Sequence, residues 1–400
     1  MSSTRPSAPQ EIVLVGGGHT HVGVLKRFAD KPEPGVRLTL ICRDAHTPYS
    51  GMLPGYVAGH YRHEDVHIDL PRLARYAGAR FLHDEAIGID HDACTVLCRT
   101  HPPVSYDLMS INIGATPRVG HVQGADRHAV PVKPVHRFND RWQALLHRLR
   151  DRPGPARIAV VGGGAGGVEL ILAMQYRLGR ELSAIGRDPA ELAFALYTRG
   201  ASILPTHNAR VQTHFRNTLA ARGIVVHTGT EIVEVEGGRM RDAADRWHMA
   251  DEIAWVTSAG GPDWLRATRL ALDDSGCIRV DDTLRSMSDP RIFAAGDIAH
   301  QVHHPREKAG VFAVRQAAPL ARNLRASVQG RQLTPYRPQK RWLALISTGD
   351  RYAVASRGGL YLAGRWLWHW KDRIDRRFMA GFDVAADVAT EEAALSRKRR

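Results

Sequence analysis

Two stretches of the chain share one pattern of hydrophobic and polar positions. Ile12–Val15 and Ile158–Val161 are aliphatic runs, each followed by three glycines and then by a segment with helical periodicity. An aliphatic, β-branched run that ends in glycines before a helix is typical of the strand–turn–helix start of a βαβ unit. Because the pattern occurs twice, the sequence predicts two doubly wound α/β units.

Shorter aliphatic runs extend both units. Residues 36–42 and 194–198 are the predicted second strands of the first and second units, and the Pro- and Gly-containing stretch 151–155 predicts a turn between them. The remaining strands are expected within 222–256, where 236–246 forms a polar hairpin, and at 278–280 and 292–295, which return to the first unit.

Composition narrows the class of protein. The chain has 400 residues, 44% of them hydrophobic, and lacks the run of about 18 apolar residues that predicts a transmembrane helix. The formal net charge of +14 favours anionic partners such as dinucleotides or acidic lipid, whereas no nucleic-acid-binding fold is recognised. The four cysteines match no zinc spacing, so we expect no metal site and a reducing cytoplasm: Cys42, Cys94, Cys98 and Cys277.

The glycines after each aliphatic run carry the first candidate chemistry. A Gly-rich turn brings backbone N–H groups close to a pyrophosphate, and the helix behind it adds the positive end of its dipole. The first turn has Gly16 and Gly18, but His21 stands where a third glycine belongs, so its side chain must point aside or the helix must shift. The second turn is complete and is followed by an acidic residue: Gly162, Gly164, Gly166, Gly167 and Glu169.

The residues at the ends of the two second strands are candidates for binding the ribose of each dinucleotide. An acidic residue about 20 residues after the glycines usually binds the ribose hydroxyls, and both units lack it. The first strand ends in Cys42 and Arg43, with Asp44 one position further, and the second ends in Thr198 and Arg199. An arginine in place of a carboxylate suits a 2′-phosphate and hints at NADPH, although such an arginine is also common as surface charge.

Four further motifs make the chain similar to a known family: residues 47–55, 106–117, 292–298 and 308–316. With the two glycine turns, they resemble the pyridine-nucleotide-disulfide oxidoreductases, in particular the type II NADH dehydrogenase-like branch and a subgroup that also occurs fused to selenophosphate synthetase. The resemblance implies an α/β fold of two Rossmann-like domains, the second inserted in the first, plus a C-terminal segment. The implied parts are an FAD domain at 11–118 and 272–335, an NAD(P) domain at 119–271, a C-terminal segment at 336–385, and flexible termini at 1–10 and 386–400.

The resemblance also implies site residues. Glu169 would lie near the nicotinamide, and Lys308 and Lys340 on the side of the flavin and the acceptor, where a cation stabilises a reduced anion. The implied FAD site consists of Gly16, Gly18, His19, Thr20, Cys42, Arg43, Ser50, Gly51, Ala115, Asp297, Gly310, Val311 and Phe312. The implied NAD(P)H site consists of Gly162, Gly164, Gly166, Gly167, Thr198, Arg199 and Gly260.

The positions of the cysteines argue against a thiol relay. Disulfide reductases of this fold carry a cysteine pair shortly after the first unit begins, but residues 45–65 contain no cysteine. Cys94 and Cys98 are expected in a β-hairpin as small core residues. We therefore expect electrons to pass from NAD(P)H through FAD to a diffusible acceptor. Quinone is the acceptor that we favour. A sulfur- or selenium-linked reductase and a low-turnover flavin sensor are the alternatives.

Residues 364–379 combine three tryptophans with five basic residues. At helical spacing, Trp366, Trp370, Ile374 and Phe378 fall on one side, as in helices that lie in a membrane interface. The type II dehydrogenase resemblance agrees and implies a peripheral position on the cytoplasmic face of the inner membrane. Packing against the protein's own FAD domain, or a homodimer interface, is the alternative for this helix.

Overall fold

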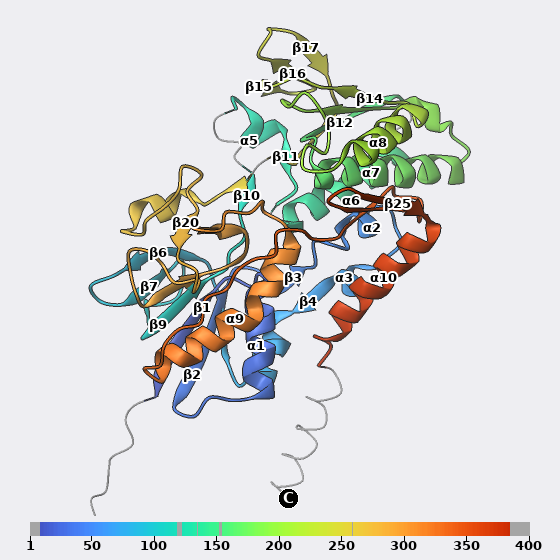
Figure 1. The fold of residues 1–400 in the computed structure, drawn as a ribbon. Helices are drawn as coiled ribbons and strands as arrows, with labels where there is room; N and C mark the ends of the chain where they lie inside the picture. The colour runs from blue at the N-terminus through green and yellow to red at the C-terminus, as the bar shows by residue number, and fades with distance from the viewer. Residues whose placement is uncertain (1–8, 118–121, 134, 152–153, 258, 385–400) are drawn as a thin grey trace, which may run out of the picture.

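Two five-stranded parallel sheets form the centre of the molecule in this computed structural model, which describes residues 9–117, 122–133, 135–151, 154–257 and 259–384. The unit built on the first sheet lies below the unit built on the second in the view of Figure 1. In sequence, the whole second sheet falls between two adjacent strands of the first. The two Rossmann-like units predicted from the sequence are therefore confirmed, with the second inserted in the first.

The first sheet has the order β21-β9-β1-β2-β5, and all its neighbours are parallel. Its core residues are mostly aliphatic, which fits a sheet covered by helices on its faces. The strands are β1 (Gln10–Val15), β2 (Val36–Cys42), β5 (Arg80–His83), β9 (Leu108–Ile111) and β21 (Ile292–Ala294).

Helices α1 (His19–Asp30) and α9 (Gly310–Val328) pack side by side on the first unit. Their approach is close because Gly23 faces Ala317: a Cβ added to Gly23 would lie 2.5 Å from the Cβ of Ala317. Shorter helices follow the chain around this sheet: α2 (Leu53–Val57), α3 (His63–Val66) and α4 (Leu70–Tyr76).

The second sheet has the order β11-β18-β12-β13-β14, again all parallel. Its strands are β11 (Val130–Pro131), β12 (Ala156–Val161), β13 (Leu192–Tyr197), β14 (Ile224–His227) and β18 (Glu252–Trp255). Its helices are α5 (Ala125–His128), α6 (Val135–Asp151), α7 (Ala165–Ala184) and α8 (Ala209–Ala221).

Small antiparallel sheets complete the two units. The predicted polar hairpin is the three-stranded sheet of β15 (Ile232–Glu236), β16 (Arg239–Asp242) and β17 (Trp247–Met249). The others are β3 (His46–Pro48) with β4 (His67–Asp69), β6 (Ala86–Asp90) with β7 (Thr95–Cys98) and β8 (Val104–Ser105), and β10 (Thr116–Pro117) with β19 (Ala259–Gly260).

Two sequence expectations need refinement. Strand β21 joins the first sheet as predicted, but β20 (Ile278–Val280) pairs in parallel with β22 (Ala299–Gln301) in a sheet of its own. Cys94 does not lie within a strand: it occupies the turn between β6 and β7 with a φ of 52°. A left-handed conformation at a non-glycine residue is uncommon and is not visible in a hydrophobic pattern.

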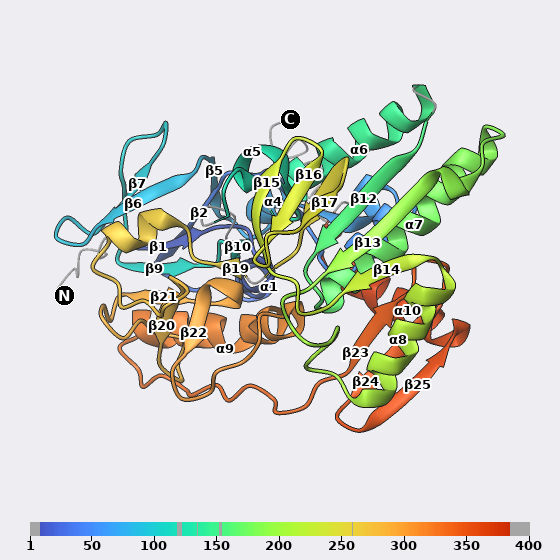
Figure 2. The ribbon, with the colours of Figure 1, turned by 90° about the horizontal axis from the view of Figure 1, so that it is seen from above.

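The C-terminal segment forms a three-stranded sheet and one helix. Strands β23 (Ala344–Ser347), β24 (Ala353–Arg357) and β25 (Leu360–Gly364) are antiparallel, and α10 (Arg365–Ala380) follows directly. Figure 2 shows this sheet beside α8 of the second unit, where Tyr361 Oη and His214 Nδ1 are 3.0 Å apart. None of the helices in the described ranges has the length and apolarity needed to cross a bilayer.

Candidate functional site

A cavity opens at the carboxyl ends of β1, β2 and β9, where the first Gly-rich turn leads into α1. The N-termini of α1 and α9 both face it, through Gly18 and His19 on one side and Lys308 and Gly310 on the other. Two helix N-termini give a positive field that suits an anionic ligand. Most of the expected FAD residues line the cavity: Gly16, Gly18, His19, Cys42, Arg43, Ser50, Ala115, Asp297 and Gly310.

The first turn is held against the end of β9 so tightly that only glycine fits. Gly16 has a φ of +92°, and a Cβ there would lie 2.6 Å from the carbonyl oxygen of Asn112. A Cβ on Gly18 would lie 2.3 Å from Asn112 Oδ1. That oxygen accepts hydrogen bonds from the backbone N–H groups of Thr20 (3.1 Å) and His21 (3.2 Å). Asn112 therefore fixes the first turn of α1.

The side chain of His21 is accommodated at the position where the third glycine is missing. Its ring is fully buried between helix and sheet, with Nδ1 2.7 Å from the carbonyl oxygen of Gly16 and Nε2 2.9 Å from Ser110 Oγ. In the second turn the equivalent Gly167 is so close that a Cβ would lie 1.8 Å from the carbonyl oxygen of Gly162. The first turn thus replaces a backbone contact by a hydrogen-bonded side chain. Burial lowers the pKa of His21 to about 4, so the ring is neutral.

One buried polar atom at the cavity has no partner within the protein. His19 lines the cavity, and its Nε2 is buried without a hydrogen bond. Burial lowers the pKa of His19 to about 4, although the nearby Asp297 opposes the shift. Because buried polar atoms are nearly always hydrogen-bonded, this nitrogen fits a site that is completed by a polar ligand such as a dinucleotide.

Asp297 and Lys133 form an ion pair on the cavity wall, with Lys133 Nζ 2.6 Å from Asp297 Oδ2. Burial alone would raise the pKa of Asp297, but Lys133, Lys308 and His19 outweigh it and lower the pKa. The carboxylate is therefore ionised, with its Oδ1 available to accept a hydroxyl hydrogen bond. Lys308 also lines the cavity and donates to the carbonyl oxygen of Ala299 at 2.8 Å.

The second turn is packed against the neighbouring strand at its first glycine and open at its third. Gly162 has a φ of +135°, and a Cβ there would lie 2.5 Å from the carbonyl oxygen of Val256. Gly164 is exposed, and a Cβ on it would meet nothing within 4 Å. A Cβ on Gly166 would lie 3.5 Å from the side chain of Val256. Gly164 thus offers the open approach that a pyrophosphate requires.

Glu169 lies one turn into α7 and faces the C-terminal sheet. Its Oε1 accepts hydrogen bonds from Ser347, from the backbone N–H at 2.7 Å and from Oγ at 3.0 Å. Burial raises the pKa of Glu169, while the charge of Lys371 and the Ser347 hydrogen bonds oppose the shift. Lys371 in turn contacts Asp375 Oδ2 at 2.6 Å and the carbonyl oxygen of Gly51 at 2.5 Å. Glu169, α10 and the loop at Gly51 therefore share one polar cluster.

The remaining predicted residues take various positions. Thr20 is buried and donates from Oγ1 to the carbonyl oxygen of Ala313 at 2.7 Å, while Phe312 packs against Trp342 with a centroid distance of 5.2 Å. Val311 follows Gly310 in the first turn of α9, and Gly260 pairs with Thr116 between the two units. Lys340 is exposed and is not among the residues that line the cavity.

Sequence reasoning did not assign roles to Asn112, Lys133, Ser347, Lys371 or Asp375. Asn112 stands at the carboxyl end of an aliphatic strand, and this position could have identified it as a candidate site residue. Lys133 and Lys371 are two of only seven lysines in the chain. The partner of Lys133 is Asp297, 164 positions away, which no spacing rule joins. Lys371 and Asp375 stand at the i, i+4 spacing of one helix, a signal that could have identified the pair.

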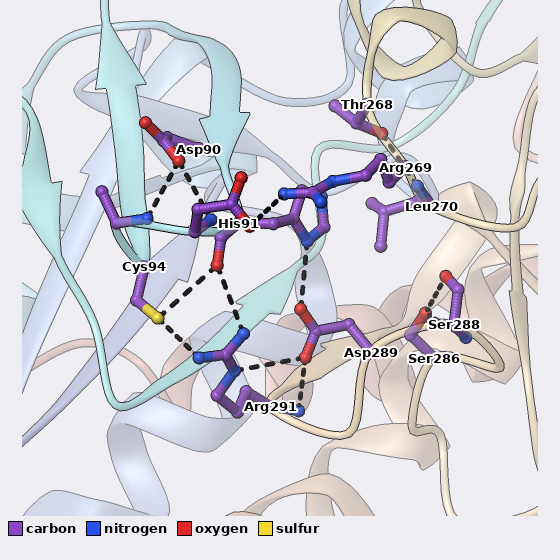
Figure 3. A network of polar contacts seen from close by, with 12 residues as sticks. Asp90, His91, Cys94, Thr268, Arg269, Leu270, Ser286, Ser288, Asp289 and Arg291 are labelled. Atoms are coloured by element: carbon purple, nitrogen blue, oxygen red, sulfur yellow. Dashed lines mark hydrogen bonds and ion pairs between the residues drawn. The ribbon is translucent and has the colours of Figure 1, made fainter.

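Of the four cysteines, Cys42 lines the described cavity, and a Cβ on Gly17 would lie 3.1 Å from its Sγ. Cys94 and Cys98 pack against the first core as expected. Cys94 also accepts a hydrogen bond from Arg291, which bonds Asp289, and Asp289 in turn contacts His91 at 3.0 Å (Figure 3). This network lies at the β6–β7 turn. In the described ranges, no group of three His, Cys, Asp or Glu side chains could hold a metal ion.

Comparison with known proteins agrees with this geometry. The family model described as pyridine nucleotide-disulphide oxidoreductase matches residues 10–318. The NADH dehydrogenase-like protein YutJ of Bacillus subtilis is 24% identical over 335 residues, 82% of this chain and 87% of YutJ. Demethylphylloquinone reductase NdbB of Synechocystis is 26% identical over 307 residues, 73% of this chain and 72% of NdbB.

The solved structures show the same fold. The sulfide:quinone oxidoreductase of Aquifex aeolicus superposes with a TM-score of 0.76 at 18% identity, over 96% of this chain and 94% of that structure. FAD and NAD(P)H are the cofactors that these similarities indicate, and the two Gly-rich turns, the two helix N-termini and His19 fit them. The chain therefore belongs to the pyridine nucleotide-disulphide oxidoreductases, in the type II NADH dehydrogenase-like branch of these flavoproteins.

Proposed function

We propose that this protein is an FAD-dependent NAD(P)H dehydrogenase that passes electrons to a quinone. The observation that carries the proposal is the position of α10. Its outer face exposes Trp366, Trp370 and Ile374, while Lys371 on the same helix holds the loop at Gly51, next to the cavity. A membrane-dissolved acceptor would meet the protein at such a face. The demethylphylloquinone and sulfide:quinone enzymes among its similar proteins support the same class of acceptor.

The first cavity would hold FAD mainly through backbone groups. Gly16 and Gly18 would admit the pyrophosphate at the N-terminus of α1, and Asp297 Oδ1 would accept a hydrogen bond from the ribityl chain. Lys308 and the N-terminus of α9 supply positive potential that favours negative charge on the ring. Bound there, FAD supplies the two-electron chemistry that takes hydride from a nicotinamide and releases electrons to the acceptor.

The second turn would position the donor. Gly164 would give a pyrophosphate access to the start of α7, while Gly162 and Gly167 allow the turn and the helix to pack closely on the strand. Gly260 and Thr116 join the two units by a backbone pairing, which would help to hold the two nucleotide sites in position. Such positioning is the main contribution a protein makes to hydride transfer between cofactors.

The polar cluster around Glu169 would serve proton transfer to the quinone. Since Ser347 occupies Oε1, a proton would reside on Oε2, and burial raises the pKa of Glu169 while Lys371 and Ser347 oppose the shift. Lys371 donates to Asp375 and to the carbonyl oxygen of Gly51 in the same cluster. A general acid whose pKa is shifted toward the working pH transfers protons most effectively.

An anaerobic stopped-flow titration tests the proposal. The purified, FAD-loaded protein is mixed with NADH or NADPH and then with a soluble ubiquinone analogue, while the flavin absorbance is recorded. We expect bleaching by at least one donor and recovery with the quinone. Bleaching without recovery would reject quinone and favour a sulfur- or selenium-linked acceptor, whereas no bleaching by either donor would favour a sensor.

The variant Gly164→Val separates the two nucleotide sites. Because the added side chain projects into open space, we expect the fold and the FAD content to be retained and flavin reduction by NAD(P)H to fall at least about 100-fold, since the pyrophosphate approach is blocked. Gly179→Val, on the far part of the same helix, is the matched control. Unchanged reduction kinetics in Gly164→Val would remove this turn from the donor site.

A further inference from the structure

In a dinucleotide-binding unit, the carboxyl end of the second strand, here β13, faces the adenosine ribose. This strand ends beside the Gly-rich turn: a Cβ on Gly163 would lie 2.7 Å from the side chain of Thr198. Residues 198–205 contain no carboxylate that could bind ribose hydroxyls. The position that touches the turn is a threonine, and the next one is Arg199.

The backbone around Arg199 is fixed, whereas its side chain is not. Thr198 N donates to the carbonyl oxygen of His227 at 2.9 Å, Thr230 N to that of Thr198 at 2.9 Å, and Gly229 N to that of Gly200 at 2.9 Å. The side chain of Arg199 is nevertheless 77% exposed. The guanidinium is thus anchored at the ribose end of the turn but remains able to turn toward a ligand.

Glu231 is the carboxylate paired with Arg199, and the pair is weak. The distance from Arg199 Nη1 to Glu231 Oε1 is 3.4 Å, longer than a normal charge-assisted hydrogen bond, and the Glu231 side chain is 50% exposed. Exposed pairs of this kind contribute little to stability. A phosphate dianion could therefore displace Glu231 and receive two parallel N–H donors from the guanidinium.

We infer that the protein selects NADPH over NADH, with Arg199 binding the 2′-phosphate and Glu231 competing for the same guanidinium. The inference rests on the proposed function, since it concerns the donor of the same reaction. Arg199 and Glu231 are specificity determinants here and take no part in hydride transfer.

Two measurements test the inference. The first is calorimetric titration of the FAD-loaded protein with 2′,5′-ADP and with 5′-AMP, which needs no turnover. The second is kcat/KM for NADPH and NADH. We expect 2′,5′-ADP to bind at least about tenfold more tightly than 5′-AMP. We expect kcat/KM for NADPH to exceed that for NADH by at least about tenfold. Equal affinities, or a preference for 5′-AMP and NADH, would overturn the inference. Absence of flavin reduction with tight 2′,5′-ADP binding would instead sink the proposed function alone.

Variants assign the preference to residues. Arg199→Gln should lower kcat/KM for NADPH about tenfold or more and leave the value for NADH nearly unchanged, and Glu231→Gln should raise NADPH binding. Thr198→Glu should reverse the preference by repelling the phosphate. Arg157→Gln, an exposed arginine at the amino end of β12, is the control and should change neither donor. An unchanged NADPH/NADH ratio in Arg199→Gln would refute the role of Arg199.

Discussion

At the scale of single residues, the two Gly-rich turns solve one steric problem in two ways. Gly167 lets helix and strand touch, whereas His21 fills the wider gap and satisfies Gly16 and Ser110 by hydrogen bonds. The sequence alone made His21 look like a defect in the turn. The structure shows that it is a packed and hydrogen-bonded component of the helix–sheet contact.

His21 should make stability depend on pH. Its pKa is about 4 in the fold and 6.5 in the unfolded chain, so the unfolded state binds more protons as the pH falls through 6.5 toward 4. Stability should therefore be lost on acidification, by about 2 kcal/mol between pH 7 and pH 5 for this residue. Denaturant unfolding of the wild type and of His21→Gln at both pH values checks this. Equal losses in the two proteins would show that His21 does not contribute.

At the scale of elements, α10 is a tether as well as a surface. Its Phe378 stacks on Tyr49 with a centroid distance of 4.4 Å, so this ring does not continue the exposed stripe as the helical spacing had suggested. Lys371, only 13% exposed, bonds Asp375 and the Gly51 carbonyl. The inner face of α10 thus supports the loop beside the cavity, and its outer face stays free.

Removing the amine of Lys371 should loosen this tether. Lys371→Met leaves the buried carboxylate of Asp375 without its cation, which typically costs about 3–5 kcal/mol. We expect a matching drop in unfolding free energy and a shifted flavin spectrum. Lys371→Met/Asp375→Asn should recover part of the stability because no buried charge remains. The exposed neighbour Arg373→Met should change stability by less than about 0.5 kcal/mol. An unchanged unfolding free energy and an unchanged flavin spectrum in Lys371→Met would show that Lys371 does not hold the Gly51 loop.

At the scale of the whole molecule, β25 and α10 follow each other along one edge of the ribbon (Figure 1) and carry several of the exposed large apolar side chains. Trp366, Trp370 and Ile374 are 57%, 42% and 42% exposed, and Leu360 and Leu362 add to them. With the net charge of +14, such a face is suited to the surface of an anionic membrane. We propose that the protein docks there from the cytoplasmic side.

Vesicle binding tests this docking. The triple variant Trp366→Ser, Trp370→Ser, Ile374→Ser should bind anionic phosphatidylglycerol vesicles at least about tenfold more weakly than the wild type. The fold should be retained, because none of the three side chains is buried. The control is Trp247→Ser, Met249→Ser, which removes exposed apolar side chains on β17 of the second unit. Equal weakening in both variants, or none in the first, would rule out α10 as the docking surface.

The sequence by itself determined the two parallel sheets, both Gly-rich turns and the helical nature of the C-terminal segment, because these follow from local periodicity and from steric rules for glycine. It placed Asp297, Lys308 and Gly310 in segments that do border the cavity. Only the tertiary structure decided that Asn112 locks the first turn, that Lys133 meets Asp297, and that Glu169 accepts hydrogen bonds from Ser347. The tertiary structure also placed Lys340 away from the residues that line the cavity. These contacts join residues from 90 to nearly 180 positions apart, and no local pattern records a pairing that depends on how the chain folds back on itself.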